Sequence, residues 1–405
     1  MANTLKFGNG EWYGKKDTIL AYNDENSNYK PLPFNFSRAS KATVINKDGL
    51  IEEVGSGQPR IDYKDDSKGA LLLEPSRTNS IIQSENLGTS WSTFNGGYIS
   101  TNESTSPDGL LTADKLSTNG TSFSFVRPST NPTISTGNTT FTVFAKADTS
   151  DELWLRLDYG TNIYNRKFNL TTQTISTGFD NTGNIPDEET IEDYGNGWYR
   201  LRITDSADTT IFNPRIYVSD ATPTSGDSVF LWGAQLESGS YATSYIPTQG
   251  SVVTRLADSC SNGGNEQVFD NNTSVLFIDF SRFIYEFGIN TSALTLRNSS
   301  GSEQIRFHFD YPSKVVRFRD AKNGFTTIGG NIVTETNTRK KVALKIDGTT
   351  LKVFADGSQI GSDYTRPNAF DFSYINLGSS GDKLFDIKYY NTTLTDQELA
   401  ALTQV

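Results

Sequence analysis

Apolar and polar residues alternate with a period of two in strand-length runs along this chain, and this alternation constrains its fold more than any other feature. The clearest run lies in Ser228–Thr248, where Phe230, Trp232, Ala234 and Leu236 alternate with Leu231, Gly233, Gln235 and Glu237. A period of two is typical of a half-buried β-strand. The run ends at Ser238-Gly239-Ser240, a combination typical of a turn.

Similar runs recur through the chain, and clusters of Gly, Asn, Ser and Thr separate them. They are Phe141–Ala147, Glu152–Tyr159, Tyr164–Leu170, Trp198–Thr204, Asn213–Ser219 and Val229–Glu237, followed by Val275–Phe280, Ala293–Arg297, Gln304–Phe309, Lys314–Arg319, Lys341–Ile346, Leu351–Ala355 and Phe385–Tyr389. A helical period of useful length is absent. The sequence therefore predicts an all-β protein with two antiparallel β-sandwich domains of jelly-roll type.

The runs and turn signals also suggest where the domains begin and end. We expect an irregular N-terminal anchor and assembly segment at 1–35, a hairpin-containing region at 36–80, a first sandwich at 81–250, a linker at 251–264 and a second sandwich with a short C-terminal helix at 265–405. Trp12 is either a docking residue of the anchor or an aromatic folded back onto the first domain. Cys260 falls in the linker, where we expect a weakly ordered thiol rather than a catalytic one.

Composition excludes several classes of function. The formal net charge is −11 and Lys and Arg form no block, which disfavours a nucleic-acid partner. The single cysteine, Cys260, permits no intrachain disulfide, as in a protein that folds in a reducing cytoplasm. The first residues show no apolar signal-peptide core, and no run approaches the roughly 18 apolar residues of a membrane span, so we expect neither secretion nor membrane insertion.

The run Asp151–Asp158 carries the most suggestive candidate site. Its three leucines should face the core, which leaves Trp154, Arg156 and Asp158 together on the other face. An aromatic ring that covers the C–H face of a sugar, with charged planar groups that bond its hydroxyls, is a carbohydrate-binding combination. The outer members of this candidate site are Tyr164, Arg215 and Tyr217. In the alternative interpretation, Trp154 covers the sheet under a loop and Arg156–Asp158 is a surface ion pair.

Catalytic and metal-binding motifs are weak. His308 is the only histidine, and no Gly-x-Ser-x-Gly elbow is present. Neighbouring carboxylates such as Glu52 and Glu53 should point to opposite faces of a strand, which argues against a shared site. The chain also lacks an EF-hand loop, a histidine cluster and a cysteine pair. We therefore expect no catalytic residues and no enzymatic activity.

Four short blocks in residues 36–79 carry a resemblance to a known class of proteins. They are Phe36-Ser37-Arg38-Ala39-Ser40, Asp48-Gly49-Leu50-Ile51-Glu52, Pro59-Arg60-Ile61-Asp62-Tyr63 and Leu72-Leu73-Glu74-Pro75-Ser76-Arg77-Thr78-Asn79. With Ser228–Thr248, they resemble the β-sandwich modules, similar to carbohydrate-binding modules, of bacteriophage fibre and head-spike proteins. The blocks carry no known chemistry. We expect Arg38, Arg60 and Arg77 to bond backbone carbonyls or carboxylates, and Trp198 and Trp232 to lie in the core.

The C-terminal part carries a second resemblance. The segment KVALKIDGTTLKVFADGSQIG and the ending IKYYNTTLTDQELAAL resemble concanavalin A-like (laminin G-like) sandwiches. Asp347-Gly348 and Asp356-Gly357 are hairpin signals. Thr395 and Glu398 form a capping box, with Leu394 and Leu399 as the hydrophobic staple, which predicts a short helix at the end of the chain.

Together these resemblances imply a bacteriophage virion protein, made in the host cytoplasm, that is a head-fibre, spike or tail-fibre subunit. They imply homotrimers, contact with other virion proteins through the N-terminal segment, and attachment to host surface glycans. They also allow a structural calcium ion, with Glu237 as a candidate ligand. A purely architectural or decoration subunit that binds no glycan is the first alternative, and a polysaccharide depolymerase is the second.

Overall fold

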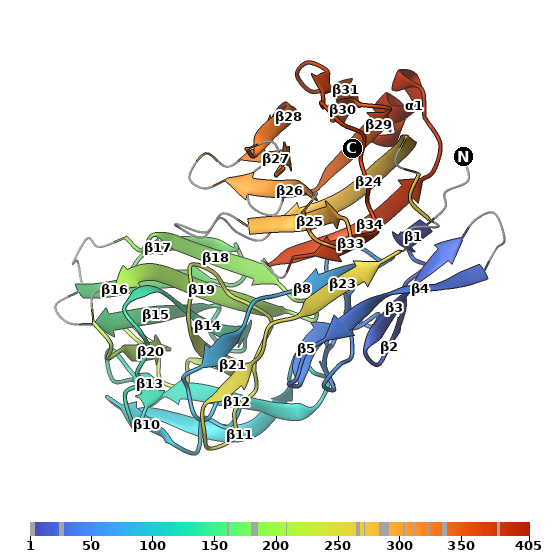
Figure 1. The fold of residues 1–405 in the computed structure, drawn as a ribbon. Coiled ribbons are helices and arrows are strands. Elements are labelled where there is room, and N and C mark those ends of the chain that lie inside the picture. The colour runs from blue at the N-terminus through green and yellow to red at the C-terminus, as the bar shows by residue number, and fades with distance from the viewer. Residues whose placement is uncertain are drawn as a thin grey trace. The chain divides into compact units, whose positions relative to one another are not determined.

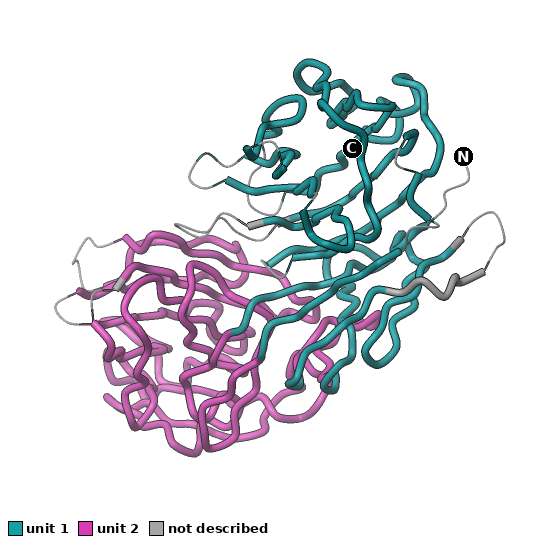
Figure 2. The backbone as a smooth tube through the Cα atoms, in the orientation of Figure 1, with its two compact units in different colours: residues 1–41, 54–76, 256–405 teal, residues 42–53, 77–255 magenta. Residues whose placement is uncertain are grey.

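The computed structural model describes residues 5–23, 28–159, 162–179, 185–207, 209–264, 268–270, 272–282, 291–302, 304–310, 313, 315–322, 324–333, 338–378 and 381–405. It confirms an all-β chain, since strands make up almost all of the regular structure in these residues (Figure 1). The chain divides into two compact units (Figure 2). Unit 1 consists of Met1–Lys41, Val54–Ser76 and Leu256–Val405, and unit 2 consists of Ala42–Glu53 and Arg77–Arg255.

Unit 2 is a sandwich of two six-stranded antiparallel sheets. The first sheet has the order β10 (Trp91–Phe94), β13 (Phe125–Pro128), β20 (Asn213–Tyr217), β15 (Glu152–Tyr159), β16 (Asn162–Asn169) and β17 (Thr174–Thr177). The second has the order β11 (Gly97–Thr105), β12 (Leu111–Thr118), β21 (Ser228–Ser238), β14 (Gly137–Ala147), β19 (Trp198–Ala207) and β18 (Glu188–Asp193). Leu155 of the first sheet and Phe141 and Leu231 of the second belong to the core between them.

A second apolar layer covers the other face of the second sheet. Phe144, Trp198 and Trp232 are buried there with Tyr245, so the core positions expected for both tryptophans are confirmed. The layer also contains residues of the hairpin of β5 (Ala42–Ile45) and β6 (Ile51–Val54), which lies within the region 36–80 where a hairpin is expected. The short strands β9 (Arg77–Asn79) and β22 (Val253–Arg255) pair beside the sandwich.

Unit 1 is built on one continuous series of antiparallel pairings. The order is β30 (Thr350–Ala355), β29 (Lys340–Asp347), β24 (Thr273–Arg282), β34 (Asp382–Tyr390), β1 (Leu5–Gly8), β3 (Thr18–Asn23), β4 (Asn28–Ser37), β23 (Ser259–Gly263), β33 (Tyr374–Leu377), β25 (Thr291–Arg297), β26 (Gln304–Asp310), β27 (Val315–Asp320) and β28 (Thr326–Val333). Shorter strands join this series: β2 (Tyr13–Lys15), β7 (Arg60–Asp62), β8 (Ala70–Leu73), β31 (Ser358–Gln359) and β32 (Tyr364–Thr365). One large apolar core, which includes Phe34, Leu276 and Phe307, holds these strands together.

The N-terminal segment differs from the irregular anchor expected at 1–35. Its described residues form β1 to β3 and most of β4, and β1 pairs with β34 near the other end of the chain. Leu5 and Phe7 are buried in the core of unit 1. Trp12 is folded back, and its Nε1 donates to the Gly69 carbonyl at 3.0 Å. Polar turns separate these strands, so their composition resembles that of a loop. Pairing of β3 with β2 and β4, and pairing of β1 with the distant β34, order them.

The expected linker at 251–264 also differs, because it contains β22 and β23. Cys260 pairs with Phe36 of β4 and with Leu377 of β33, and it is buried. This burial raises the pKa of the Cys260 thiol well above its ordinary value. Gly263 is required by packing, since a Cβ atom at this position would lie 2.4 Å from the ring of Phe34. The glycines and serines that suggest a linker therefore belong to β23, a strand that packs closely against the Phe34 ring in the core.

The C-terminal helix is confirmed. It is α1 (Asp396–Leu402), and Thr395 and Glu398 form the predicted capping box. Leu394 and Leu399 are buried against a cluster that contains Phe277 and Phe354. The hairpin turns at Asp347-Gly348 and Asp356-Gly357 are confirmed as well, between β29, β30 and β31.

The arginines of the phage-like blocks hold the fold together. Arg38 Nη1 donates to Asp258 Oδ1 at 3.0 Å, and Arg60 Nη1 donates to Glu74 Oε2 at 2.6 Å. Arg60 Nη2 pairs with the other oxygen of Asp258, and the side chains of Arg38, Arg60 and Asp258 are fully buried. The structural role expected for Arg38 and Arg60 is confirmed. The guanidinium of Arg77 lies 5.1 Å from the ring centre of Tyr241.

Candidate functional site

The first sheet of unit 2 brings five of the six predicted site residues onto one face. Trp154 of β15 lies opposite Tyr217 of β20, and Arg156 lies opposite Arg215 in the same pair of strands. Asp158 follows two residues later, so its side chain shares the face. Leu153, Leu155 and Leu157 point into the core from the other face, as the alternation predicts.

The charged members of this set pair with one another. Arg156 Nε lies 2.7 Å from Asp158 Oδ1, and Arg215 Nη2 lies 3.0 Å from Asp158 Oδ2. Arg215 Nη1 also donates to the Tyr217 hydroxyl at 3.2 Å. The two guanidinium groups thus share one carboxylate, and the three side chains are largely buried. The group stabilises the sheet face without a ligand.

Trp154 is covered and cannot serve as a stacking platform for a sugar. Its exposed fraction is 5%, and that of Tyr217 is 3%. Phe179, from the segment after β17, packs with its ring centre 6.0 Å from that of Trp154 and 5.0 Å from that of Tyr217. Lys167 lies with its Nζ 5.6 Å from the indole. This is the alternative interpretation of the sequence, in which a loop covers the tryptophan.

Tyr164 lies on the opposite face of the sheet from Trp154, which corrects its place in the predicted site. In the register of β15 and β16, Tyr164 lies opposite Leu157, whose side chain points into the core. Its ring stacks on that of Tyr159, with 5.7 Å between the ring centres. The reason is the pattern of β16 itself, because Tyr164 shares its face with Phe168, a core residue.

Glu237, the candidate calcium ligand, is occupied by protein donors. Its carboxylate accepts hydrogen bonds from Gln235 Nε2 at 2.6 Å, from Thr243 N at 2.9 Å and from Thr243 Oγ1 at 2.7 Å. Among the residues that the structure describes, no group of three or more His, Cys, Asp or Glu side chains is placed to hold a metal ion. Likewise, no helix in the described residues is long and apolar enough to cross a membrane.

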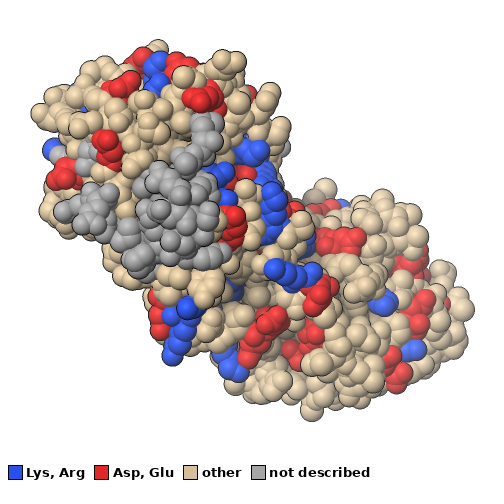
Figure 3. Space-filling model, turned by 90° about the vertical axis from the view of Figure 1, so that its right-hand side faces the viewer, with Lys and Arg blue, Asp and Glu red and all other residues tan. Residues whose placement is uncertain are grey.

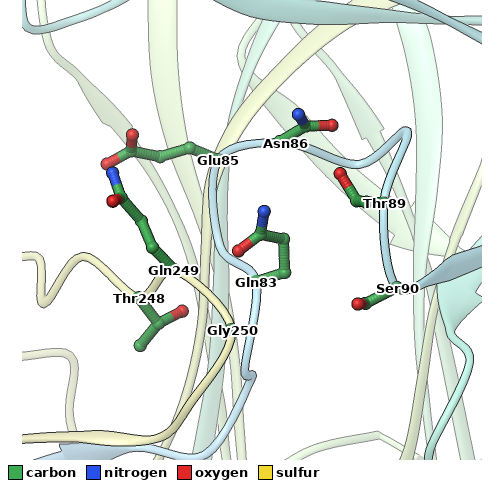
Figure 4. A pocket seen from close by; sticks show the side chains of 8 residues that line it. All are labelled: Gln83, Glu85, Asn86, Thr89, Ser90, Thr248, Gln249 and Gly250. Carbon is green, nitrogen blue, oxygen red and sulfur yellow. The ribbon is translucent and has the colours of Figure 1, made fainter.

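A polar pocket of about 400 Å³ lies elsewhere in unit 2 (Figure 4). It is lined by Gln83, Glu85, Asn86, Thr89, Ser90, Thr248, Gln249 and Gly250. Figure 4 shows the carboxyl group of Glu85 beside the amide of Gln249, with Gln83 between these residues and the segment that carries Thr89 and Ser90. The lining presents amides, hydroxyls and a carboxyl group, and lacks aliphatic and aromatic side chains.

Two segments distant in the sequence form the walls of the pocket, and hydrogen bonds fix them together. Gly250 N donates to the Ile82 carbonyl at 2.7 Å, and Thr248 N donates to Ser84 Oγ at 2.8 Å. Asn79, which is fully buried, donates to the carbonyls of Ala234 at 3.1 Å and Ile246 at 2.9 Å. The last residue of the phage-like block Leu72–Asn79 thereby ties this part of the chain to Ser228–Thr248.

Two polar groups of the pocket have unusual surroundings. The Gln83 Oε1 atom is buried and has no hydrogen-bond partner among the residues that the structure describes. Glu85 Oε1 accepts a hydrogen bond from the Tyr245 hydroxyl at 3.1 Å. Burial raises the pKa of Glu85 above its ordinary value, and the charges of Asp108 and Glu53 raise it further, while the Tyr245 bond opposes the shift.

The sequence prediction missed this pocket. Residues 83–90 and 248–250 are short polar loops without periodicity, so no pattern marks them as a site. The available signal was indirect: the first loop begins a few residues after the block that ends at Asn79, and the second begins at the last residue of Ser228–Thr248. A binding site on loops that a rigid sandwich positions is a common arrangement.

Comparison with known proteins adds little about this site. No family model matches the chain, and no curated protein matches it. Among solved structures, Trypanosoma rangeli sialidase in complex with the inhibitor DANA matches with a TM-score of 0.29 and 12% identity over 95% of this chain. The GH43 BlXynB protein from Bacillus licheniformis matches with a TM-score of 0.24 and 10% identity over 94% of this chain and 85% of that chain.

The chain spans 65% of the length of the sialidase chain that it matches. At these TM-scores the likeness assigns neither a substrate nor a catalytic residue to this chain. The matches do correct the expectation that the chain has no enzymatic activity, because the similar structures include enzymes. That expectation is not retained.

Proposed function

We propose that the chain binds carbohydrate in the polar pocket of unit 2. The observation that carries the proposal is the Gln83 Oε1 atom, which is buried at the pocket without a hydrogen-bond donor among the described residues. A buried amide oxygen without a donor is costly, and a rotation of the Gln83 side chain toward a hydroxyl group of a bound molecule would satisfy it. Sugars offer many such hydroxyls.

The other lining groups suit the same class of ligand. Gln249 and Asn86 supply amides that both donate and accept, and Thr89, Ser90 and Thr248 supply hydroxyls. A volume of about 400 Å³ lies within the range of small-molecule sites, which is roughly 300 to 1,000 Å³. The residues that line the pocket include no aliphatic or aromatic side chain, which disfavours a lipid or an aromatic ligand.

We further propose that this binding serves attachment of a bacteriophage particle to glycans on its host. The support is the sequence resemblance, which covers both segments that Asn79 ties together. As a trimeric fibre or spike subunit the chain would present several copies of a weak site, and avidity would supply the strength of attachment. Localisation of the chain in an intact particle, and a sedimentation measurement of its oligomeric state, test this part. A stable monomer at micromolar concentration would contradict the trimer.

A glycan array probed with the full chain tests the binding proposal. The wild type should bind a restricted set of glycans, and the double variant Gln83→Ala/Gln249→Ala should lose about tenfold or more in affinity for them, since hydrogen bonds to a buried ligand are removed. The double variant Gln359→Ala/Gln404→Ala, which removes two glutamines of unit 1, is the matched control and should bind as the wild type does. Absence of signal on all glycans would favour the architectural alternative.

The raised pKa of Glu85 supports a second candidate function, which is cleavage of the bound polysaccharide. A general acid in glycoside hydrolysis needs a raised pKa so that it can protonate the glycosidic oxygen, and a second carboxylate completes the pair. Glu85 has the raised pKa, and the charges of Asp108 and Glu53 act on it. Release of reducing ends from an array-positive polysaccharide, abolished by Glu85→Gln, would support cleavage. Binding without release would restrict the function to attachment.

A further inference from the structure

Unit 1 carries a face rich in arginine that the proposed function does not use. The face lies on β25, β26, β27 and β33, opposite the core residues Phe307 and Phe318. Its charged side chains are Arg297, Arg306, His308, Asp310, Arg317 and Arg319, which we call the arginine face. Asp310 is the one carboxylate that the described residues of these strands place on it. The face is thus strongly positive in a chain of net charge −11.

The register places two arginines directly opposite one another and His308 opposite a third arginine. Arg306 of β26 lies opposite Arg319 of β27, and His308 lies opposite Arg317. Like charges directly opposite on antiparallel strands destabilise a sheet. In the view of Figure 3, acidic and basic side chains are interspersed over much of the surface, which is the ordinary distribution for a protein surface. A function that uses positive charge explains why the arginine face does not show this mixed distribution of charges.

Asp310 neutralises only part of the positive charge of the arginine face. It lies 3.3 Å from His308 Nε2 and 3.5 Å from Arg319 Nη2, and it also pairs closely with Arg317. One carboxylate is therefore shared among three cationic or basic groups. The Nε atoms of Arg297, Arg317 and Arg319 are buried and donate to no acceptor among the described residues. A single carboxylate therefore leaves the positive charge of the arginine face incompletely neutralised.

Aromatic rings border these arginines. The guanidinium of Arg297 lies 5.3 Å from the ring centre of Tyr374, and that of Arg306 lies 5.1 Å from the ring centre of Phe325. Phe325 is 44% exposed, so its ring remains open to a ligand. Guanidinium groups beside an open aromatic ring provide anion recognition and sugar stacking on one surface.

We propose that the arginine face binds an anionic saccharide, through the carboxylate or phosphate groups that such a polymer carries. The charge balance of the whole chain favours a sparsely charged saccharide over a nucleic acid, since a net charge of −11 repels a long and uniformly anionic polymer. This site is separate from the pocket of unit 2, and its test does not depend on the pocket.

Titration calorimetry of the full chain with four probes tests the proposal. The probes are a mannose oligosaccharide that carries a single galacturonate, one that carries a single phosphate, a neutral oligomannose of equal length and single-stranded DNA of equal length. One of the two anionic saccharides should bind at least about tenfold more tightly than the neutral one, and its affinity should fall with added salt. The difference between them identifies carboxylate or phosphate as the recognised group. Tighter binding of DNA than of both saccharides would overturn the proposal, as would equal binding of the neutral probe.

Variants of the opposed pair locate the binding. Arg306→Gln/Arg319→Gln should lose about tenfold or more in affinity for the anionic saccharide, and Arg306→Lys/Arg319→Lys should retain part of it through charge alone. The control Lys340→Gln/Lys345→Gln removes the same charge from β29 and should bind as the wild type does. The melting temperature of the Gln double variant should equal or exceed that of the wild type, because the substitutions remove two like charges that lie opposite one another. Unchanged affinity, or a melting temperature well below that of the control, would overturn the proposal.

Discussion

Arg60 and Asp258 lie 198 positions apart in the chain and form an ion pair in which both side chains are fully buried. Arg60 belongs to a phage-like block and Asp258 precedes β23, so the pair joins two of the three segments that make up unit 1. Asp258 also accepts from Arg38 Nη1 and from the Glu74 backbone nitrogen at 2.9 Å. Arg38, Arg60 and Asp258 therefore hold the segments of unit 1 together.

Removal of Arg60 should destabilise unit 1 strongly. Arg60→Ala leaves Asp258 and Glu74 buried without their full complement of partners, and we expect a loss of about 3 to 5 kcal/mol in the free energy of unfolding. Chemical denaturation measures it. Arg202→Ala is the control, since its partner Glu188 is half exposed and an exposed pair contributes about 0 to 1 kcal/mol. Equal losses for the two variants would contradict the structural role of Arg60.

Trp154→Ala should reduce stability and leave carbohydrate binding intact. The indole is covered by Phe179 and Lys167, and loss of such a side chain costs about 3 kcal/mol or more. Trp154→Phe should cost less, because an aromatic ring still packs under Phe179. Both variants should bind array-positive glycans as the wild type does. Loss of binding by Trp154→Phe without loss of stability would restore the sequence-based site on the first sheet.

Gly263→Ala should destabilise unit 1 through a steric clash. A Cβ atom at this position meets the Phe34 ring at 2.4 Å, and an overpacked core costs about 1 to 3 kcal/mol. Gly55→Ala is a matched control, because its Cβ would meet nothing nearer than Gln58 Cγ at 3.9 Å. Thermal denaturation of the pair separates packing from a general effect of glycine replacement. An unchanged melting temperature for Gly263→Ala would show that β23 does not pack on Phe34 as described.

The raised pKa of Glu85 makes a prediction about pH. A carboxyl group with a higher pKa in the folded state than in the unfolded state favours folding when protonated, so its contribution is present below about pH 4.5 and is lost as the pH rises through the folded pKa. Glu85→Gln removes this dependence. The wild type should therefore lose stability relative to Glu85→Gln as the pH rises from about 4 to about 7. Denaturation curves at several pH values measure the difference, and a difference that does not change with pH would contradict the shift.

The sequence predicted the elements whose signals are local. The alternation in β15 and β21, the turn at Asp347-Gly348 and the capping box of Thr395 and Glu398 all depend on neighbouring residues, and all are present. Strand β1 was not predicted, because its pairing with β34 depends on residues more than 370 positions away. The pairings of β2 with β3 and of β3 with β4 are local, but their polar, irregular sequence showed no alternation to mark them. Local composition alone cannot report such a partner.

The candidate site illustrates the same limit. Alternation placed Trp154, Arg156 and Asp158 on one face, but it could not show that Phe179 covers the indole. The face of Tyr164 could have been read from Phe168 four residues later, since both share one side of β16. The pocket depends on hydrogen bonds between Ile82, Ser84, Thr248 and Gly250, and these contacts join loops about 165 residues apart.

A crystal structure of the full chain with an array-positive oligosaccharide tests the central claim most directly. The account predicts electron density for a sugar in the pocket of unit 2, with a hydroxyl group within hydrogen-bond distance of Gln83 Oε1 and contacts to Glu85 and Gln249. An empty pocket, with the sugar bound instead over Trp154 on the first sheet or elsewhere on the chain, would contradict it.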